Sequence, residues 1–100
     1  MGQDYLSKFN KVFENRIRLG IMSMLMVNDQ MEFTRLKELL QVTDGNLASH
    51  LSALEKEGYL AVIKQFVNKK PNTSYAVTAS GKKAFNDHLN ALEKILKGRK

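Results

Sequence analysis

The sequence predicts a mainly helical domain with one small β-hairpin, in the order helix, helix, short strand, helix, helix, hairpin, helix. Two patterns carry this prediction. Apolar residues recur at helical spacing in each predicted helix, and two runs of β-branched and aromatic residues flank the turn-forming stretch NKKPN at 68–72. The chain has 100 residues, of which 43% are hydrophobic and 26% charged. This size and composition are typical of one globular domain spanning residues 1–100.

The first two helices are predicted over residues 4–13 and 16–27. Asn15 is expected to cap the second of them, because its side chain can accept hydrogen bonds from the first free backbone N–H groups. Residues 28–30 read NDQ and predict a turn, and the alternation over 31–33 predicts a very short strand. The apolar stripes consist of Leu6, Phe9, Val12 and Phe13 in the first helix and Ile17, Ile21, Met24 and Leu25 in the second.

Two further helices are predicted over 34–40 and 43–57, separated by only a few residues. Thr34 and Thr43 are the expected N-caps. Gly58 is expected to end the second of these helices in the left-handed conformation that glycine adopts readily. The residues expected to face inward are Leu36, Leu39 and Leu40, followed by Leu47, Leu51 and Leu54.

The hairpin is predicted over 60–77, with Pro71 and Asn72 in its turn. Thr78 is then expected to cap a last long helix that extends to about residue 97. Its apolar positions at helical spacing are Phe85, Leu89, Leu92 and Leu96.

The helix at 43–57 has an unusual outer face. Opposite its leucine stripe lie small or hydrogen-bonding residues where a solvated helix usually carries Glu and Lys: Gly45, Asn46, Ser49, Ser52, Ala53 and Lys56. A helix that enters the DNA major groove, about 12 Å wide, needs an outer face that does not clash with the groove. The small residues allow close approach, and Asn, Ser and His side chains can hydrogen-bond base edges or phosphates. The alternative is an ordinary surface helix whose small residues have no special role.

The net charge of +6 is unevenly distributed. Residues 21–60 carry an excess of acidic side chains, whereas residues 61–77 contain Lys64, Lys69 and Lys70 and no acid. Both ends of the chain are also basic. This pattern suggests a polyanionic partner that contacts the hairpin and the ends, although the lysines could also serve only to solubilise an exposed turn.

Two stretches resemble a known family: LLQVTDGNLASHLSALEKEGYLAVIKQF and PNTSYAVTASGKKAF. They are similar to the small bacterial and archaeal winged helix-turn-helix transcriptional regulators related to the MarR and ArsR groups. The resemblance covers roughly residues 15–90. It implies a regulator that binds double-stranded DNA as a homodimer, with the recognition helix 43–57 in the major groove and the wing 60–77 on the backbone or minor groove.

The candidate DNA-binding residues follow from this arrangement. They are Thr43, Gly45, Asn46, Ser49, His50, Ser52 and Lys56 on the helix, and Lys64, Lys69, Lys70, Asn72 and Thr73 on the hairpin. The helix lacks an arginine that could bind guanine bidentately, so we expect modest direct base readout. Because the helix-turn-helix segment is acidic, the wing and the chain ends must supply most of the attraction to phosphate.

The terminal segments 1–14 and 82–97 are predicted to be dimerisation helices. Their apolar stripes are too extensive for so small a core, and the candidate interface residues are Phe9, Phe13, Phe85, Leu89, Leu92 and Leu96. The alternative is that both stripes pack on the single core.

Enzymatic and metal-binding functions find little support in the sequence. His50 and His88 are distant from each other, and there is no cysteine, so the ligands common in metal-sensing ArsR proteins are absent. We therefore expect a non-enzyme without a cofactor or metal, while a small-molecule effector is possible. The alternative function is a winged-helix protein–protein interaction module that does not bind DNA and that docks a partner through its acidic helix-turn-helix.

A membrane protein is not expected either. The most apolar run, residues 21–27, is far shorter than the roughly 20 residues that a spanning helix needs. The stretch MGQDYLSKFN also lacks the apolar region of a signal peptide, so the expected location is the cytoplasm.

Overall fold

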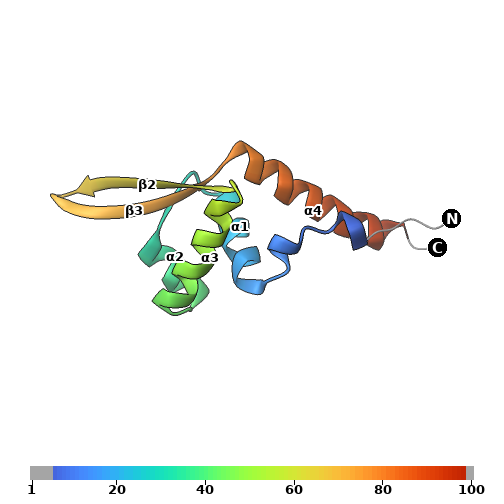
Figure 1. Cartoon of the computed structure of the whole chain (residues 1–100), viewed down its shortest axis with the longest axis horizontal. Helices are drawn as coiled ribbons and strands as arrows, with labels where there is room; N and C mark the ends of the chain where they lie inside the picture. Colours follow the sequence, from blue (N-terminus) through green and yellow to red (C-terminus); the bar gives the residue numbers. More distant parts are fainter. Residues whose placement is uncertain (1–5, 99–100) are drawn as a thin grey trace.

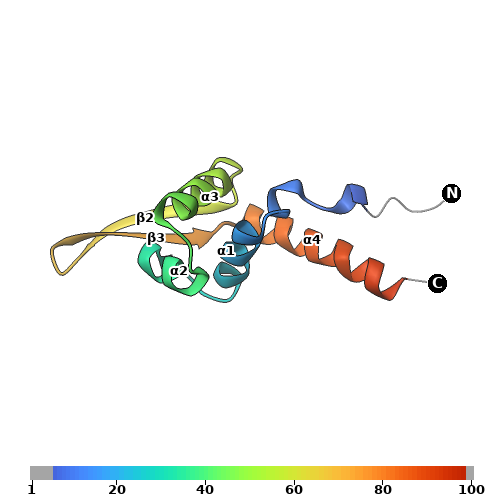
Figure 2. The ribbon, with the colours of Figure 1, turned by 90° about the horizontal axis from the view of Figure 1, so that it is seen from below.

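The computed structural model describes residues 6–98, and it confirms a mainly helical winged-helix architecture. The elements are η1 (Leu6–Lys8), η2 (Lys11–Phe13), α1 (Arg16–Met26), β1 (Met31–Glu32), α2 (Phe33–Leu40), α3 (Asp44–Lys56), β2 (Leu60–Val67), β3 (Lys70–Val77) and α4 (Ala79–Lys97). The molecule is elongated, with extents of 60 × 25 × 21 Å. The hairpin β2–β3 extends from one end and α4 from the other, with α1, α2 and α3 grouped between them (Figures 1 and 2).

The prediction of a first helix over 4–13 is wrong for the described part of that range. Two short 3-10 turns, η1 and η2, replace it, and residues 4 and 5 lie outside the described residues. Asn10 separates the two turns in an extended conformation, and its side chain accepts a hydrogen bond from the Val12 N–H at 2.9 Å. Asn side chains compete in this way with the regular hydrogen bonds of a helix. The helical periodicity of the apolar residues is therefore not sufficient to form an α-helix in this segment.

Three of the four predicted helix caps are confirmed. Asn15, Thr43 and Thr78 accept hydrogen bonds from backbone N–H groups in the first turns of α1, α3 and α4, at distances of 2.9 to 3.2 Å. The prediction that Thr34 caps α2 is wrong. The N-cap of α2 is Glu32, which makes no side-chain capping bond. β1 leads directly into α2, whose first residue is Phe33. Thr34 therefore lies within the first turn of α2 and not before it.

The core forms where the inner faces of α1, α2 and α3 meet the base of the sheet and the start of α4. Its buried hydrophobic residues are Phe13, Ile21, Met22, Leu25, Leu36, Leu47, Leu51, Leu54, Leu60 and Phe85. Leu39 is an exception to the predicted inward set, since 42% of it is exposed on the outer side of α2. Leu40 is partly buried against the core.

The sheet has the strand order β1-β3-β2, and all its pairs are antiparallel. β1 pairs only with the inner half of β3, through Met31 and Glu32. The outer half of the hairpin is therefore a two-stranded ribbon. The hairpin β2–β3 is called the wing below.

The turn of the wing is not where the sequence pattern places it. Pro71 and Asn72 belong to β3, and the turn residues are Asn68 and Lys69, with φ angles of +54° and +64°. Two consecutive residues with positive φ define the type I′ turn, whose twist matches that of the flanking strands. Pro71 pairs with Phe66 one step from the turn, where its missing N–H faces away from β2 and beyond the reach of β1.

The junction between the wing and α4 is compact. Gly58 has φ +82° and ends the preceding helical segment in the left-handed conformation, as predicted. The Tyr59 carbonyl accepts a hydrogen bond from the Thr78 N–H at 3.0 Å, and the Thr78 hydroxyl donates to the Gly58 carbonyl at 2.6 Å. These bonds hold the base of the wing against the first turn of α4.

Candidate nucleic-acid interface

The helix α3 lies with one side on the core and the other in solvent. Its buried residues, Leu47, Leu51 and Leu54, pack toward α1 and β2. Figure 2 shows α3 at the surface, next to the base of the wing. Because α3 is held by α1 on one side and the sheet on the other, its outer side is presented rigidly.

The outer side of α3 carries most of the candidate residues that the sequence analysis selected from this helix. Gly45, Asn46, Ser49, Ser52 and Lys56 are all exposed. Thr43 is also exposed, but its hydroxyl oxygen is occupied as the helix cap by the Asn46 N–H. The structure therefore brings together small and polar residues along the outer side of α3, with Lys56 at its C-terminal end.

An ion pair joins α2 to the start of this helix. The Lys37 Nζ lies 2.7 Å from a carboxylate oxygen of Asp44, and both side chains are substantially exposed. Exposed pairs contribute little to stability. The pair nevertheless places a positive charge beside the acidic residue in the first turn of α3, which lowers the repulsion of a polyanion there.

His50 and Arg18 form a second feature of this surface, and the role of Arg18 is not evident from the sequence analysis. Burial, followed by the positive charge of Arg18, lowers the pKa of His50, so its imidazole is favoured in the neutral form. The Nε of Arg18 is buried and has no hydrogen-bond partner among residues 6–98. Arg18 precedes the buried Ile21 and Met22 by three and four residues, so it lies on the same side of α1 as they do. This spacing is the feature of the sequence that indicates a partly buried Arg18.

The wing carries three cations at its exposed positions. Lys64, Lys69 and Lys70 are exposed, and none of them forms an ion pair within the described residues 6–98. Lys69 lies in the turn and Lys70 begins β3, because the turn is formed by residues 68–69 and not by Pro71 and Asn72 as predicted. Both still lie at the tip, the part of the wing farthest from the core (Figure 1).

Two other candidates on the wing lie closer to its base. The Asn72 amide donates to a carboxylate oxygen of Glu32 at 2.7 Å, and its oxygen accepts from the hydroxyl of buried Ser74 at 3.2 Å. Asn72 therefore ties the wing to β1. Thr73 is half-buried and lies opposite Lys64 in the register.

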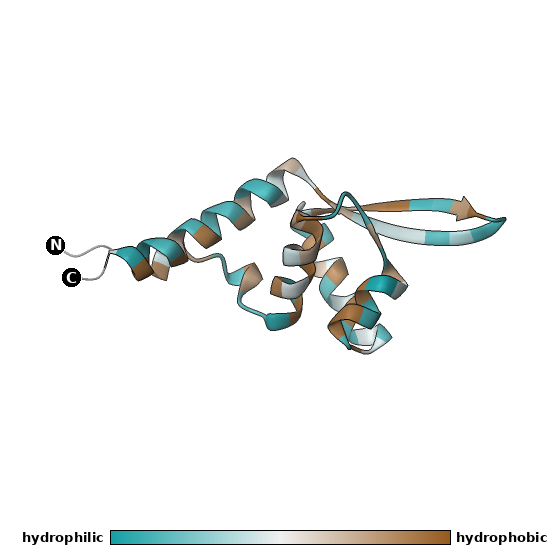
Figure 3. Ribbon diagram, turned by 180° about the vertical axis from the view of Figure 1, so that it is seen from behind, coloured by the Kyte–Doolittle hydropathy of each residue, from teal (hydrophilic) through white to brown (hydrophobic). Residues whose placement is uncertain are grey.

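The predicted dimerisation residues fall into two groups. Phe13 and Phe85 are 2% and 3% exposed, with their rings in an edge-to-face contact at 5.2 Å, so both belong to the core of the single chain. Phe9 contacts the ring of His88 and is half-buried. The second group, Leu89, Leu92 and Leu96, is exposed by 41%, 45% and 67% along α4. Hydrophobic segments recur along this helix in Figure 3.

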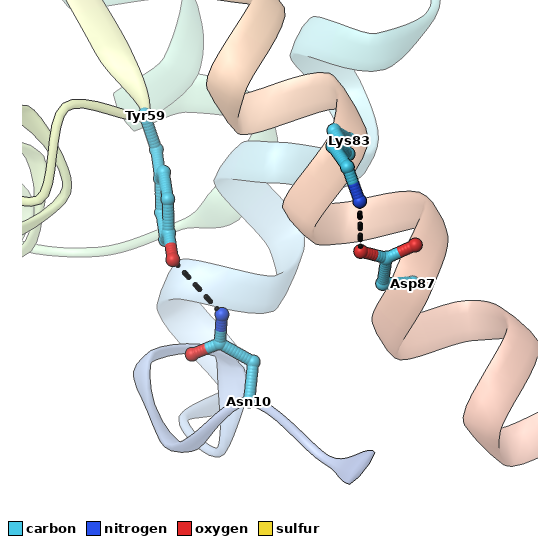
Figure 4. Close-up of polar contacts among 4 residues, drawn as sticks. All are labelled: Asn10, Tyr59, Lys83 and Asp87. Carbon is cyan, nitrogen blue, oxygen red and sulfur yellow. Dashed lines mark hydrogen bonds and ion pairs between the residues drawn. The ribbon is translucent and has the colours of Figure 1, made fainter.

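The N-terminal segment is attached to the base of the wing and to α4 by polar contacts. The Asn10 side-chain amide donates to the Tyr59 hydroxyl, and the Asn10 backbone N–H donates to the Nδ1 of His88, both at 3.0 Å. Figure 4 shows the first of these bonds beside the Lys83–Asp87 ion pair on α4. Asn10 thereby connects the N-terminal segment both to Tyr59, next to the start of β2, and to His88 of α4.

No group of three or more His, Cys, Asp or Glu side chains is arranged within residues 6–98 to hold a metal ion. No helix in this part of the chain combines the length and the apolar character needed to cross a bilayer.

Comparisons with known proteins agree with this geometry. Residues 17–96 match the family model of the winged helix DNA-binding domain. The chain is 32% identical over 87 residues to an uncharacterized protein of Methanocaldococcus jannaschii, covering 87% of this chain and 95% of that protein. It is also similar to the transcriptional regulator homologue from Pyrococcus horikoshii OT3, with a TM-score of 0.79, 30% identity, and 89% and 88% of the two chains covered.

A third similarity concerns the fold alone. Bacillus subtilis PadR, solved in complex with operator DNA, has a TM-score of 0.66 and 17% identity, with 75% of this chain and 48% of PadR covered. The arrangement of helices and wing is therefore shared with a protein whose structure includes DNA.

Proposed function

This chain belongs to the winged helix DNA-binding domain family, and from that premise we propose how it acts as a DNA-binding transcriptional regulator. The helix α3 enters the major groove, and the wing contacts the backbone or minor groove of the same duplex. Two copies bind together as a homodimer. The protein acts by binding and carries out no catalysis.

The observation that carries this proposal is the outer surface of α3. An α-helix with its side chains is about 10–12 Å in diameter, close to the roughly 12 Å width of the major groove. Short side chains on the outer surface let the helix backbone approach the base edges closely. Asn46, Ser49 and Ser52 have short side chains that can donate and accept hydrogen bonds.

The dimensions of the wing support a second contact. Its strands have eight residues each, and at about 3.3 Å per residue they span roughly 25 Å. One turn of B-DNA is about 34 Å long, so an adjacent groove lies about half that distance away. The wing is thus long enough to reach beyond the groove that α3 occupies.

The wing and α3 differ in charge, so they are suited to different parts of the duplex. The cations of Lys64, Lys69 and Lys70 can contact phosphates, which positions a protein without reading sequence. The uncharged side chains of Asn46, Ser49 and Ser52 on α3 are suited to base edges instead. Direct readout of base edges therefore depends on α3, whereas the salt dependence of binding depends on the wing.

The homodimer rests on the exposed leucines of α4. Leu89, Leu92 and Leu96 follow one another at helical spacing along a helix that extends away from the core (Figures 1 and 3). Two copies related by a two-fold axis could bury these residues against each other. Such a dimer would place two α3 helices on successive half-sites of one duplex. A small-molecule effector that modulates this arrangement stays a prediction.

The decisive experiment measures the dissociation constant for duplex DNA against salt concentration. We compare the wild type with the double variant Lys69→Ala, Lys70→Ala, using a random duplex and a duplex selected by the protein. Each phosphate contact contributes about 0.9 to the log–log slope. The double variant should therefore flatten the slope by up to roughly 2 per protomer and weaken both duplexes about equally.

A matched control removes the same charge elsewhere. Lys94→Ala with Lys97→Ala changes two exposed lysines at the far end of α4, so its slope measures what the basic chain end contributes, and the wing variant should flatten the slope further than this control does. An unchanged slope in the wing variant would mean that the wing does not contact phosphate.

The alternative function has its own observable. A protein-interaction module would use the acidic surface of α2 and α3 and would bind no duplex even at low salt.

If duplex binding is present, single Ala variants of Asn46, Ser49 and Ser52 should each relax the preference at one or two base pairs, at a cost of about 1–3 kcal/mol. Unchanged preference in all three would place the specificity elsewhere.

A further inference from the structure

The tip of the wing is apolar as well as basic. Phe66 is 76% exposed and its neighbour Val67 is 43% exposed, in the outer half of the hairpin, with which β1 does not pair. Pro71 lies opposite Phe66 in the register and is also exposed. The two rings therefore share one face of the ribbon, and this pair lies one step from the type I′ turn.

The Phe66–Pro71 pair is a non-hydrogen-bonded pair of the ladder. The pair next to a two-residue turn, Val67 with Lys70, exchanges the ladder hydrogen bonds, so the following pair does not. Side chains stand closest together at such pairs. Phe66 and Pro71 thus form a narrow apolar edge across the width of the ribbon.

This edge does not belong to the core. With 76% of its surface exposed, Phe66 contributes little to the core, and a polar β-forming residue such as threonine would serve the strand as well. Its surroundings indicate the partner. Lys64 lies two residues away on the same face, Lys69 and Lys70 lie beyond it, and residues 60–77 contain no acidic residue. An apolar edge surrounded by cations is complementary to a polyanion with an apolar interior.

We propose that Phe66, supported by Pro71, is a wedge that inserts into the minor groove between two base pairs of the bound duplex; this inference rests on the proposed DNA-binding function. Apolar side chains of this kind partially unstack a base step and kink the duplex toward the major groove. The lysines around the wedge neutralise the phosphates that approach each other at a narrowed groove. No bond is made or broken in this step.

The wedge gives the protein a source of sequence preference that α3 lacks. Pyrimidine–purine steps such as TA are easily unstacked, whereas A-tracts are stiff. A wedge therefore favours duplexes with a flexible step at the position of the wing tip, without any hydrogen bond to a base. This indirect readout complements an α3 surface that carries no arginine.

The test uses a duplex selected by the wild-type protein from a random pool, in which 2-aminopurine replaces each adenine in turn. Unstacking raises the fluorescence of this base analogue, and energy transfer between dyes at the duplex ends reports the kink. We compare Phe66→Ser with Phe66→Leu, because leucine is itself an effective wedge residue. Val67→Ser is the matched control, since it removes a neighbouring exposed apolar side chain from the opposite face of the ribbon.

The expected result is a fluorescence rise at one or two adjacent positions with the wild type and with Phe66→Leu. The rise and the kink should be lost in Phe66→Ser, together with about tenfold in affinity, and kept in Val67→Ser. Replacing the affected step by an A-tract should weaken the wild type and leave Phe66→Ser nearly unaffected.

Three outcomes would overturn the wedge. The first is wild-type binding without a local fluorescence rise, and the second is equal loss in Phe66→Ser and Val67→Ser. The third is a change of sedimentation mass in Phe66→Ser, because the tip would then contact a second copy of this chain. If the wild type binds no duplex at low salt, the proposed function fails as well, so the two failures are distinguishable.

Discussion

Replacing Gly81 by alanine tests the junction that holds the wing to α4. Gly81 is buried in the first turn of α4, and its N–H donates to the capping hydroxyl of Thr78 at 2.9 Å. An added Cβ would lie 2.3 Å from the Tyr59 carbonyl oxygen and 2.8 Å from a methyl group of Val77. Since the nearest atom is backbone, the clash cannot be relieved by a side-chain rotation.

The expected cost follows from these contacts. Overpacking in a closed site costs about 1–3 kcal/mol. The Tyr59 carbonyl also accepts the Thr78 N–H, and shifting it weakens a hydrogen bond with a net value of about 0.5–1.5 kcal/mol. Alanine recovers roughly 0.5–1 kcal/mol through its higher helix propensity. The net destabilisation is on the order of 2 kcal/mol, which corresponds to a fall in Tm of roughly 8–16 °C for a domain of this size.

The assay is thermal unfolding followed by circular dichroism at one fixed protein concentration, because dimerisation would make Tm depend on concentration. Gly45→Ala is the matched control. An added Cβ at Gly45 meets nothing within 4 Å on the exposed side of α3, so this change should raise Tm slightly. Equal Tm values for Gly81→Ala and the wild type, or a larger loss for Gly45→Ala, would refute the described packing at the junction.

Three further predictions concern assembly, the wing and pH. Leu89→Glu with Leu92→Glu should give a monomer with much weaker DNA binding, and an unchanged sedimentation mass would contradict the α4 interface. Asn72→Ala removes the bond to Glu32 and should raise amide hydrogen exchange in the wing while leaving the helices protected; equal wing exchange would show that this bond does not order it. The pKa of His50 is lowered in the folded state, so the folded protein binds fewer protons and loses stability as pH falls below about 6.5, with no contribution above that value. His50→Gln should therefore reduce the loss of Tm between pH 7 and pH 5, and an identical loss would contradict this role.

The sequence alone determined the elements whose signals are local. The caps at Asn15, Thr43 and Thr78 and the left-handed Gly58 are confirmed, because each depends on one side chain and its immediate neighbours. The leucine stripe of α3 likewise set which side of that helix is buried. The family resemblance and the winged-helix order follow from these same segments and are confirmed by the family match.

Other features depend on contacts between distant segments, and only the tertiary structure decided them. The helical period of residues 6–13 is overridden by Asn10, which bonds to Val12 locally and to Tyr59 and His88 across the fold. The same is true of the turn of the wing. Pro71 is a turn former by itself, yet the pairing of Phe66 with it moves the turn to residues 68–69.

The apolar residues of α4 show most clearly why the sequence pattern does not decide burial. Periodicity marks Phe85, Leu89 and Leu92 as equally apolar positions of α4, because it reports only which side of the helix they occupy. The structure buries Phe85 against Phe13 and leaves both leucines exposed. Burial depends on where α4 leaves the core, and that point is set by the junction of Tyr59, Thr78 and Gly81, which no local pattern encodes.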